Sequence, residues 1–243
     1  MRILIIRHGD PDYEHDTLTE KGHREAQLLA DRYAKEKIDY FYSSPLGRAK
    51  HTCDYVAKAH GKQDKVIVKD WLQEFGKYHV LPTGEEKHIF WDLLPEFWTK
   101  IDDMYDYEKW KEQDFYVTSG LTAYYNEVVN SLDELLKEHG YVRNGRLYET
   151  KQGNHDTIAF FCHGGLEVVL LSHLCNISPI PLAHHFGALT SSVTTLYTEE
   201  RRKGKAVFRC ASFGDTGHLY AGGEPTSFAA RFCEVYEDDT RHD

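Results

Sequence analysis

The stretch Ile3-Leu4-Ile5-Ile6-Arg7-His8-Gly9 predicts a buried strand that ends in a loop. A short apolar run closed by a glycine is typical of a parallel strand in an open α/β sheet, where ligands bind at the carboxyl ends of the strands. An imidazole there can attack phosphorus, and a guanidinium can hold the non-bridging oxygens through paired hydrogen bonds. The stretch therefore predicts an α/β fold with a site for phosphoryl transfer, although three residues alone also fit an ordinary strand end.

A second segment, Tyr42 to Thr52, adds a candidate anion site. It follows a short aromatic strand candidate, and Ser44 is placed to cap a helix that begins at Pro45. Arg48 would then lie in the first turn of that helix, and a helix N-terminus with an arginine binds anions. The alternative is an ordinary capped helix with a solvated arginine.

A third segment repeats the arrangement of the first one. The apolar run 157–162 is followed by His163-Gly164-Gly165 and then by an apolar helix over 166–174. Two strands that deliver His8 and His163 to the same edge of one sheet would bring the two imidazoles together.

These segments together resemble the histidine phosphatase superfamily, the phosphoglycerate mutase-like group, in its branch with a second His-Gly motif. The resemblance spans residues 2 to about 175 and rests on motifs that occur in the family's order. The motifs are Arg7-His8-Gly9, Leu18-Thr19-x-x-Gly22, Ser44-Pro45-Leu46-x-Arg48-Ala49-x-x-Thr52 and His163-Gly164-Gly165. The fold that it implies is a three-layer α/β/α sandwich with a mostly parallel sheet and a helical lid insertion.

The resemblance also implies a role for each motif residue. His8 would be the catalytic nucleophile. The phosphate-binding residues would be Arg7, Arg48, His163, Gly9 and Gly164. His8 has to be neutral at its attacking nitrogen, so its other nitrogen should donate to a carbonyl or carboxylate. His163 is more useful as a cation that stabilises the developing charge, and no metal ion and no cofactor are expected beside such a set of cations.

The acid/base residue is expected to be Glu74. In this branch of the family a glutamate on the loop after a middle strand usually protonates the leaving group, and Glu74 follows the strand candidate 66–68. Its aromatic neighbours could raise its pKa. Asp10, Asp12 and Glu85 are rivals, whereas Gly164 stands where a sister branch of the family has its aspartate.

The loop Asp10 to Asp16 departs from the family pattern. It reads Asp-Pro-Asp-Tyr-Glu-His-Asp, where many relatives carry a polar residue that contacts phosphate. Carboxylates beside phosphate repel it unless they are turned away, protonated or paired with a cation. They could instead recognise hydroxyl or amine groups of the substrate.

The composition excludes several other classes of protein. The 243 residues carry a net charge of −10, from 29 basic and 39 acidic residues, without a basic run interleaved with aromatics, so no nucleic-acid partner is expected. No apolar stretch is long enough for a membrane span or a signal peptide. Five scattered cysteines indicate reduced thiols in a cytoplasmic protein. The histidines lack metal-ligand spacing.

The chain is expected to form a single domain over 1–243 with a helical lid insertion at about 76–140. The aromatics in that insertion are at helical spacing, which usually indicates core packing, and one or two could face the pocket. Residues 192–198 and 206–212 are predicted to form a hairpin at the edge of the sheet, and 141–154 a surface hairpin or loop. His218 follows the hairpin of residues 192–212. It could touch substrate, pack in the core or cap a helix.

The expected function is hydrolysis of a small phosphorylated metabolite through a phosphorylated His8. A phosphomutase is the close alternative, and it would need extra cations for a second anionic group, with Lys77, Lys87 and His88 as candidates. A non-catalytic scaffold is a third alternative, although such a protein would be expected to lose one of the pocket residues. The sequence predicts neither the substrate nor the oligomeric state.

Overall fold

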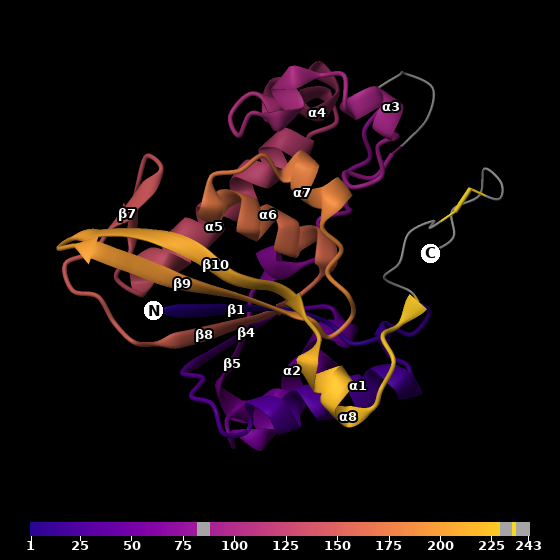
Figure 1. Cartoon of the computed structure of the whole chain (residues 1–243), viewed down its shortest axis with the longest axis vertical. Coiled ribbons are helices and arrows are strands. Elements are labelled where there is room, and N and C mark those ends of the chain that lie inside the picture. Colours follow the sequence, from indigo (N-terminus) through magenta and orange to yellow (C-terminus); the bar gives the residue numbers. More distant parts are fainter. Residues whose placement is uncertain (82–87, 229–234, 237–243) are drawn as a thin grey trace.

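A central sheet organises the protein in a computed structural model that describes residues 1–81, 88–228 and 235–236 (Figure 1). Within these residues eight strands form the sheet in the order β5 (Val66–Val68), β4 (Tyr40–Ser43), β8 (Thr157–Cys162), β1 (Arg2–Arg7), β9 (Val193–Arg202), β10 (Lys205–Asp215), β7 (Leu147–Glu149) and β6 (Val142–Asn144). The first four strands are parallel, and the others continue the sheet by antiparallel pairing. Two short strands, β2 (Pro11–Asp12) and β3 (Thr17–Leu18), pair separately.

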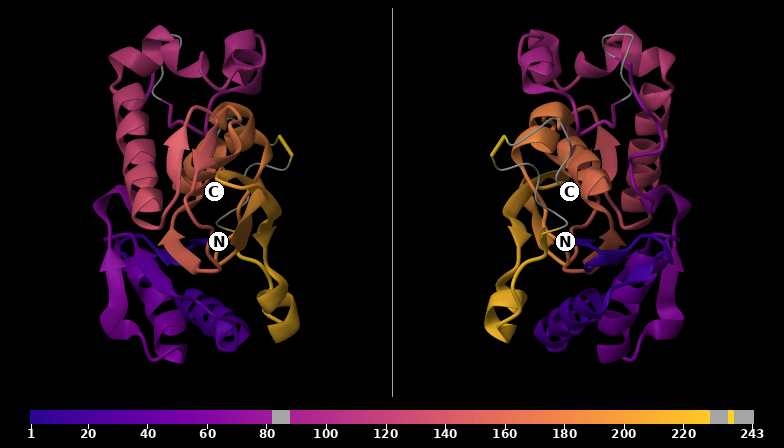
Figure 2. Two further views of the ribbon diagram at one scale, coloured as in Figure 1. Left: turned by 90° about the vertical axis from the view of Figure 1, so that its left-hand side faces the viewer. Right: turned by 90° about the vertical axis from the view of Figure 1, so that its right-hand side faces the viewer.

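Helices cover both faces of the sheet, which confirms the predicted three-layer α/β/α architecture (Figures 1 and 2). One face carries α1 (Glu20–Tyr33), α2 (Gly47–Ala59) and α8 (Gly217–Gly222), and the other carries α5 (Leu121–Glu138), α6 (Gly164–Cys175) and α7 (Pro179–His185). The four inner residues of the central strand β1, 3–6, are all apolar because the strand is buried on both sides. Ile3 and Ile5 pack in the core under α5 and α6, whereas Leu4 and Ile6 pack in the core under α1 and α2.

The segment between β5 and β6 contributes its aromatics to the larger of the two cores. Besides α5 it contains η2 (Asp70–Leu72), α3 (Pro95–Trp98), η3 (Asp102–Tyr105), η4 (Trp110–Glu112) and α4 (Asp114–Thr118), while η1 (Gln63–Lys65) precedes β5. Trp110 is fully buried, and its ring meets those of Tyr125 and Tyr116 edge-on at centroid distances of 4.9 and 5.3 Å. This aromatic cluster is continuous with the core of the sheet.

The Trp110→Ala variant is expected to unfold at a much lower urea concentration than the wild type. Removing a fully buried indole leaves a large cavity and costs about 3–5 kcal/mol of unfolding free energy. The matched control is Tyr105→Ala, whose ring is 49% exposed and which we expect to cost less than about 1 kcal/mol. Equal costs for the two variants would contradict the buried position of Trp110.

The predicted start of the second helix is wrong. The helix α2 begins at Gly47 with Leu46 as its N-cap, two residues after the predicted Pro45. The Ser44 hydroxyl accepts a hydrogen bond from the amide of Leu46 at 3.2 Å, which closes a turn before the helix. Arg48 is therefore the second residue of α2.

The predicted edge position of the C-terminal hairpin is also wrong. Strands β9 and β10 form that hairpin, but β7 and β6 extend the sheet beyond it. Tyr148 of β7 is buried against Phe208 of β10, with ring centroids 5.0 Å apart. The burial of this ring stabilises the polar hairpin 142–149 as part of the sheet.

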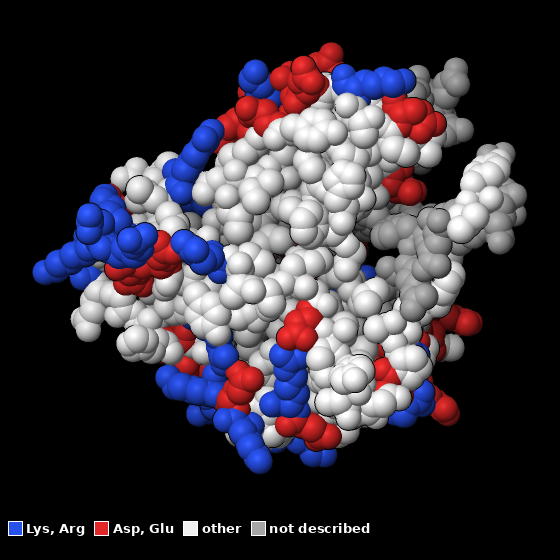
Figure 3. All heavy atoms as spheres, in the orientation of Figure 1, with Lys and Arg blue, Asp and Glu red and all other residues white. Residues whose placement is uncertain are grey.

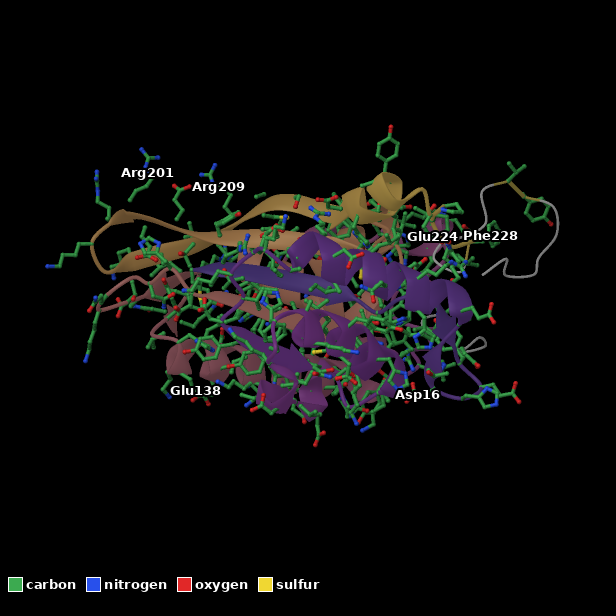
Figure 4. The ribbon with its side chains drawn as sticks, turned by 90° about the horizontal axis from the view of Figure 1, so that it is seen from below. Asp16, Glu138, Arg201, Arg209, Glu224 and Phe228 are labelled. Atoms are coloured by element: carbon green, nitrogen blue, oxygen red, sulfur yellow. The ribbon has the colours of Figure 1, made fainter. Side chains whose placement is uncertain are left out.

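Charged side chains lie around the edge of the face that Figure 3 shows. In Figure 3 lysines and arginines cluster at the tip of the β9–β10 hairpin, while the surface over α6 and α7 is largely uncharged. Figure 4 places Arg201 and Arg209 of this hairpin at the end opposite Asp16, which belongs to the loop after β1. Along the described ranges, every helix falls short of the length and apolarity that crossing a bilayer requires.

Candidate active site

Three adjacent parallel strands, β4, β8 and β1, deliver the motif residues to one edge of the sheet. In their register Arg7 lies opposite Cys162, and Ser43 lies opposite Phe161. The amide of His8 donates to the carbonyl of Cys162 at 3.0 Å, and the amide of Ser44 donates to that of Phe161 at 2.9 Å. The three predicted segments therefore meet at their carboxyl ends.

The imidazoles of His8 and His163 meet edge-on at this edge of the sheet. Their ring centroids lie 5.1 Å apart, and both rings are buried. Nδ1 of His8 lies 2.7 Å from the carbonyl oxygen of Gly9. Because a carbonyl can only accept, Nδ1 carries the proton and Nε2 keeps a lone pair. Burial, followed by the nearby charge of Arg7, lowers the pKa of His8 well below its usual value, which keeps this ring neutral.

His163 is held by a hydroxyl from the neighbouring strand. Its Nε2 lies 2.8 Å from Oγ of Ser44, and among the described residues its buried Nδ1 has no hydrogen-bond partner. Burial, then the charges of His8, Arg48 and Arg7, lower its pKa well below the usual value. The protein groups thus favour a neutral His163, and a phosphate dianion would oppose this shift. The cationic role of His163 stays a prediction.

Arg7 and Arg48 each keep donors available beside the imidazoles. Nη1 of Arg7 donates to the carbonyl of Ala188 at 2.6 Å, and Nη1 of Arg48 donates to Asp16 at 2.8 Å. Within the described part of the chain, the buried Nε atoms of both arginines lack a partner. Two guanidinium groups with spare N–H donors can bind an anion.

Glu74 lines the pocket beside this site. One of its oxygens accepts from the amides of Phe75 at 2.7 Å and of Leu166 at 3.1 Å. Burial raises its pKa, partly offset by these amides and by Arg7. The pocket has a volume of about 440 Å³ and is lined by Tyr13, Leu46, Arg48, Gln73, Glu74, Gly76, Lys77, Ile89, Trp91 and Tyr124. A carboxyl group in such a place can exchange a proton with a leaving group.

The rival carboxyl groups lie in other settings. Asp10 accepts hydrogen bonds from the hydroxyls of Thr19 and Ser227, and Asp12 pairs with His15 at the surface. Glu85 lies outside the described residues.

The acidic loop after β1 joins the site through an ion pair that the sequence did not reveal. Asp16 binds Arg48 with one oxygen and accepts from the amide of Gly47 at 2.6 Å with the other. A residue 32 positions away in the chain gives no local signal for such a pairing. The sequence left three ways to place these carboxylates near phosphate: turned away, protonated or paired with a cation. Asp16 is paired with a cation.

The glycines of the motifs allow close approaches of other groups. The amide of Gly9 donates to Oγ1 of Thr52 at 3.0 Å, and a Cβ at this position would lie 2.8 Å from the carbonyl oxygen of Gly22. A Cβ on Gly164 would lie 3.3 Å from Nη1 of Arg7. Phosphate binding by Gly9 and Gly164 stays a prediction.

The Gly165→Ala variant is expected to lose activity because this glycine touches Glu74. A Cβ there would overlap the ring of Trp91 and lie 2.7 Å from Oε1 of Glu74. Displacing an acid/base group by about 1 Å lowers kcat/KM on the order of 10²-fold. The control is Gly187→Ala, whose added Cβ meets no described atom within 4 Å. Wild-type kcat/KM in both variants would contradict the tight packing around Glu74.

His218 lies behind the site rather than in the pocket lining. Its Nε2 is 3.0 Å from Oγ of Ser191, and the amide of Ser191 donates to the carbonyl of His8. Ser191 has a positive φ of 56°, which is uncommon for a residue with a side chain. The arrangement supports the packing role for His218 among the alternatives predicted for it.

The family model of the histidine phosphatase superfamily (branch 1) matches residues 3–209. The chain belongs to this superfamily. The resemblance inferred from the four motifs is thereby confirmed, and the matched range contains every candidate catalytic and phosphate-binding residue named above.

Relatives of this family member include both phosphatases and mutases. Phosphoserine phosphatase 1 of Hydrogenobacter thermophilus is 25% identical over 219 residues, which cover 83% of this chain and 89% of the relative. A mutant phosphoserine phosphatase from Entamoeba histolytica in complex with phosphoserine has a TM-score of 0.58 at 21% identity, covering 90% of this chain and 98% of that one. A phosphoglycerate mutase from Bacillus anthracis has a TM-score of 0.53 at 18% identity, covering 92% and 96%. The solved structures share the fold.

Proposed function

We propose that this histidine phosphatase family member is a metal-independent phosphomonoesterase that hydrolyses a small phosphorylated metabolite through a phosphohistidine on His8. The observation that carries the proposal is the orientation of His8, whose Nδ1–H is held by the carbonyl of Gly9. This contact leaves Nε2 as the nucleophile, beside His163 and the spare donors of Arg7 and Arg48.

The reaction proceeds in two steps that Glu74 serves in turn. Nε2 of His8 attacks phosphorus, the P–O bond to the leaving group breaks, and Glu74 gives its proton to the leaving oxygen. Water then attacks the phosphohistidine, the P–N bond breaks, and Glu74 takes a proton from that water. The burial that raises the pKa of Glu74 favours the protonated form needed first. The arginines and His163 neutralise the phosphoryl oxygens in both steps.

The walls of the pocket suit a leaving group with an apolar or flat part. Trp91, Tyr124 and Tyr13 contribute aromatic surface, and Lys77 and Gln73 contribute polar ends. The ammonium of Lys77 lies 5.8 Å from the ring centroid of Tyr124. Since most of these residues belong to 76–140, we propose that this segment is the lid of a single domain spanning 1–243.

A phosphomutase is the second candidate, and the relatives named phosphoglycerate mutase support it. It would need cations for a second anionic group. Among the described residues Lys77 lines the pocket, whereas Nδ1 of His88 is engaged with the carbonyl of Asp92. Lys87 lies outside the described residues. The relatives named phosphoserine phosphatase and the acidic loop favour the phosphatase.

The compartment is proposed from the cysteines. The described ones, Cys53, Cys162, Cys175 and Cys210, are all free thiols. Unpaired cysteines suit a reducing compartment, so we propose that the protein is cytoplasmic.

The test is phosphate release from an aryl phosphate and a panel of phosphorylated metabolites in the presence of EDTA. We expect turnover without metal and, after rapid quenching at alkaline pH, a phosphate on His8 detected by mass spectrometry. Release that requires added metal would overturn the mechanism. Transfer to an acceptor substrate instead of water would favour the mutase.

A further inference from the structure

Glu167 is a fully buried carboxyl group that the proposed reaction does not use. It lies in the first turn of α6, and its side chain is 0% exposed. Neither of its oxygens makes a hydrogen bond of normal geometry among the described residues, although the hydroxyl of Thr194 on β9 lies close enough to lower its pKa. An ionised carboxylate in such a place is costly unless a cation compensates it.

Among the described residues, the cation whose charge acts on Glu167 is Arg7, the proposed phosphate ligand. The guanidinium of Arg7 packs on Gly164, since a Cβ there would lie 3.3 Å from Nη1. Glu167 follows three residues later, so the two positions share one face of α6. Long side chains on a helix lean toward its N-terminus, which is the end of α6 where Arg7 lies. The charge of Arg7 acts on Glu167, while Nε of Arg7 is itself buried and unpaired among the described residues.

The other titratable groups around Glu167 are two thiols, an imidazole and a second carboxyl group. Burial raises the pKa of Glu167 to about 8, and the Thr194 hydroxyl and Arg7 lower it less than burial raises it. Burial also raises the pKa values of Cys162 on β8 and Cys210 on β10, so both thiols stay neutral. His163, at the start of the same helix, has its pKa lowered. Glu74, in the loop after β5, is the second carboxyl group, and its charge raises the pKa of Glu167.

We propose that Glu167 is a positioning residue for Arg7, and that its proton decides how much of the guanidinium charge is available to phosphate. A protonated Glu167 leaves the charge of Arg7 uncompensated, and a phosphoryl group then binds tightly. An ionised Glu167 competes for the same guanidinium, and phosphate binds weakly. The inference rests on the proposed function only in taking Arg7 as a phosphate ligand.

The coupling is reciprocal, which gives it a second signature. A phosphate dianion near Arg7 opposes ionisation of Glu167, so phosphate binding above about pH 8 takes up one proton. Below that pH the carboxyl group is already protonated, and Glu167 contributes no proton exchange to binding. An ordinary structural glutamate would show neither effect.

The test is calorimetric titration of the full chain with inorganic phosphate between pH 7 and 9.5, in buffers of different ionisation enthalpy. For the wild type we expect affinity at pH 9.5 to be at least about fivefold weaker than at pH 7.5, with proton uptake on binding. The Glu167→Gln variant should bind phosphate as tightly as wild type at pH 7.5, within about twofold. Its affinity should no longer fall between pH 7.5 and pH 9.5, and binding should no longer take up a proton through residue 167. Glu167→Met is also neutral and should give the same result, so it replaces the glutamine variant if that variant folds poorly.

A control matches the change in net charge. Glu138→Gln removes an exposed carboxylate at the end of α5, far from Asp16 in Figure 4, and should keep the wild-type pH dependence. A Glu167→Gln variant with the wild-type fall in affinity would overturn the inference. Absence of phosphate binding by the wild type at pH 7.5 would instead contradict the proposed function.

Discussion

The His8→Ala variant is expected to lose essentially all phosphate release, with kcat/KM lowered on the order of 10⁴-fold or more. His8 is held with Nε2 free for attack, under the charges of Arg7 and Arg48. The measurement is steady-state hydrolysis of an aryl phosphate and of the best panel substrate in EDTA, together with the mass-spectrometric search for phosphohistidine.

Two observations would separate loss of the nucleophile from loss of the fold. His8→Ala should still bind inorganic phosphate, because Arg7 and Arg48 remain. The control His155→Ala removes an exposed imidazole near the start of β8, at the opposite edge of the sheet, and should leave kcat/KM unchanged. Hydrolysis by His8→Ala at the wild-type rate would refute the phosphohistidine mechanism.

The Glu74→Gln variant is expected to slow hydrolysis of alkyl phosphates by about 10²–10⁴-fold. An alkoxide leaving group needs a proton, and the amide of glutamine cannot supply one. Burial raises the pKa of Glu74, so its acid form persists to higher pH than that of an ordinary glutamate. In the wild type, the rate with alkyl phosphates should fall as pH rises through this raised value.

The leaving group supplies the control for Glu74. A nitrophenolate leaves without a proton, so the first step with p-nitrophenyl phosphate should lose much less in Glu74→Gln. Pre-steady-state measurement of nitrophenolate release isolates that step from hydrolysis of the phosphoenzyme. Equal losses in this step for alkyl and nitrophenyl esters would assign Glu74 a role in binding rather than in proton transfer.

The sequence predicted the parts of the site that follow from strand ends. Arg7, His8 and His163 come directly after apolar runs, and parallel strands carry such residues to one edge. Local patterns sufficed for this, together with motifs in the family's order. The start of α2 escaped prediction because the Ser44 hydroxyl closes a turn with Leu46 instead of capping the helix.

Contacts between distant positions could not be read from the sequence. The pairing of Asp16 with Arg48 depends on how the loop after β1 folds back over α2. Glu167 looks like a polar interruption of an apolar helix, and only the packing of α6 against β1 and β10 reveals that it is buried. The position of the hairpin 142–149 likewise depends on one ring, Tyr148, which finds its partner in a strand formed much later in the chain.

The pocket wall and the hydrophobic core share residues, which constrains how this protein can evolve. Tyr124 lines the pocket and stacks on the buried Phe75 with ring centroids 5.1 Å apart. Substitutions that reshape the wall for a new leaving group would therefore also loosen the packing beneath it. New specificity in this lineage should arise more readily from the rim, at Tyr13 or Gln73, or after a stabilising mutation elsewhere has supplied the margin to tolerate the loss.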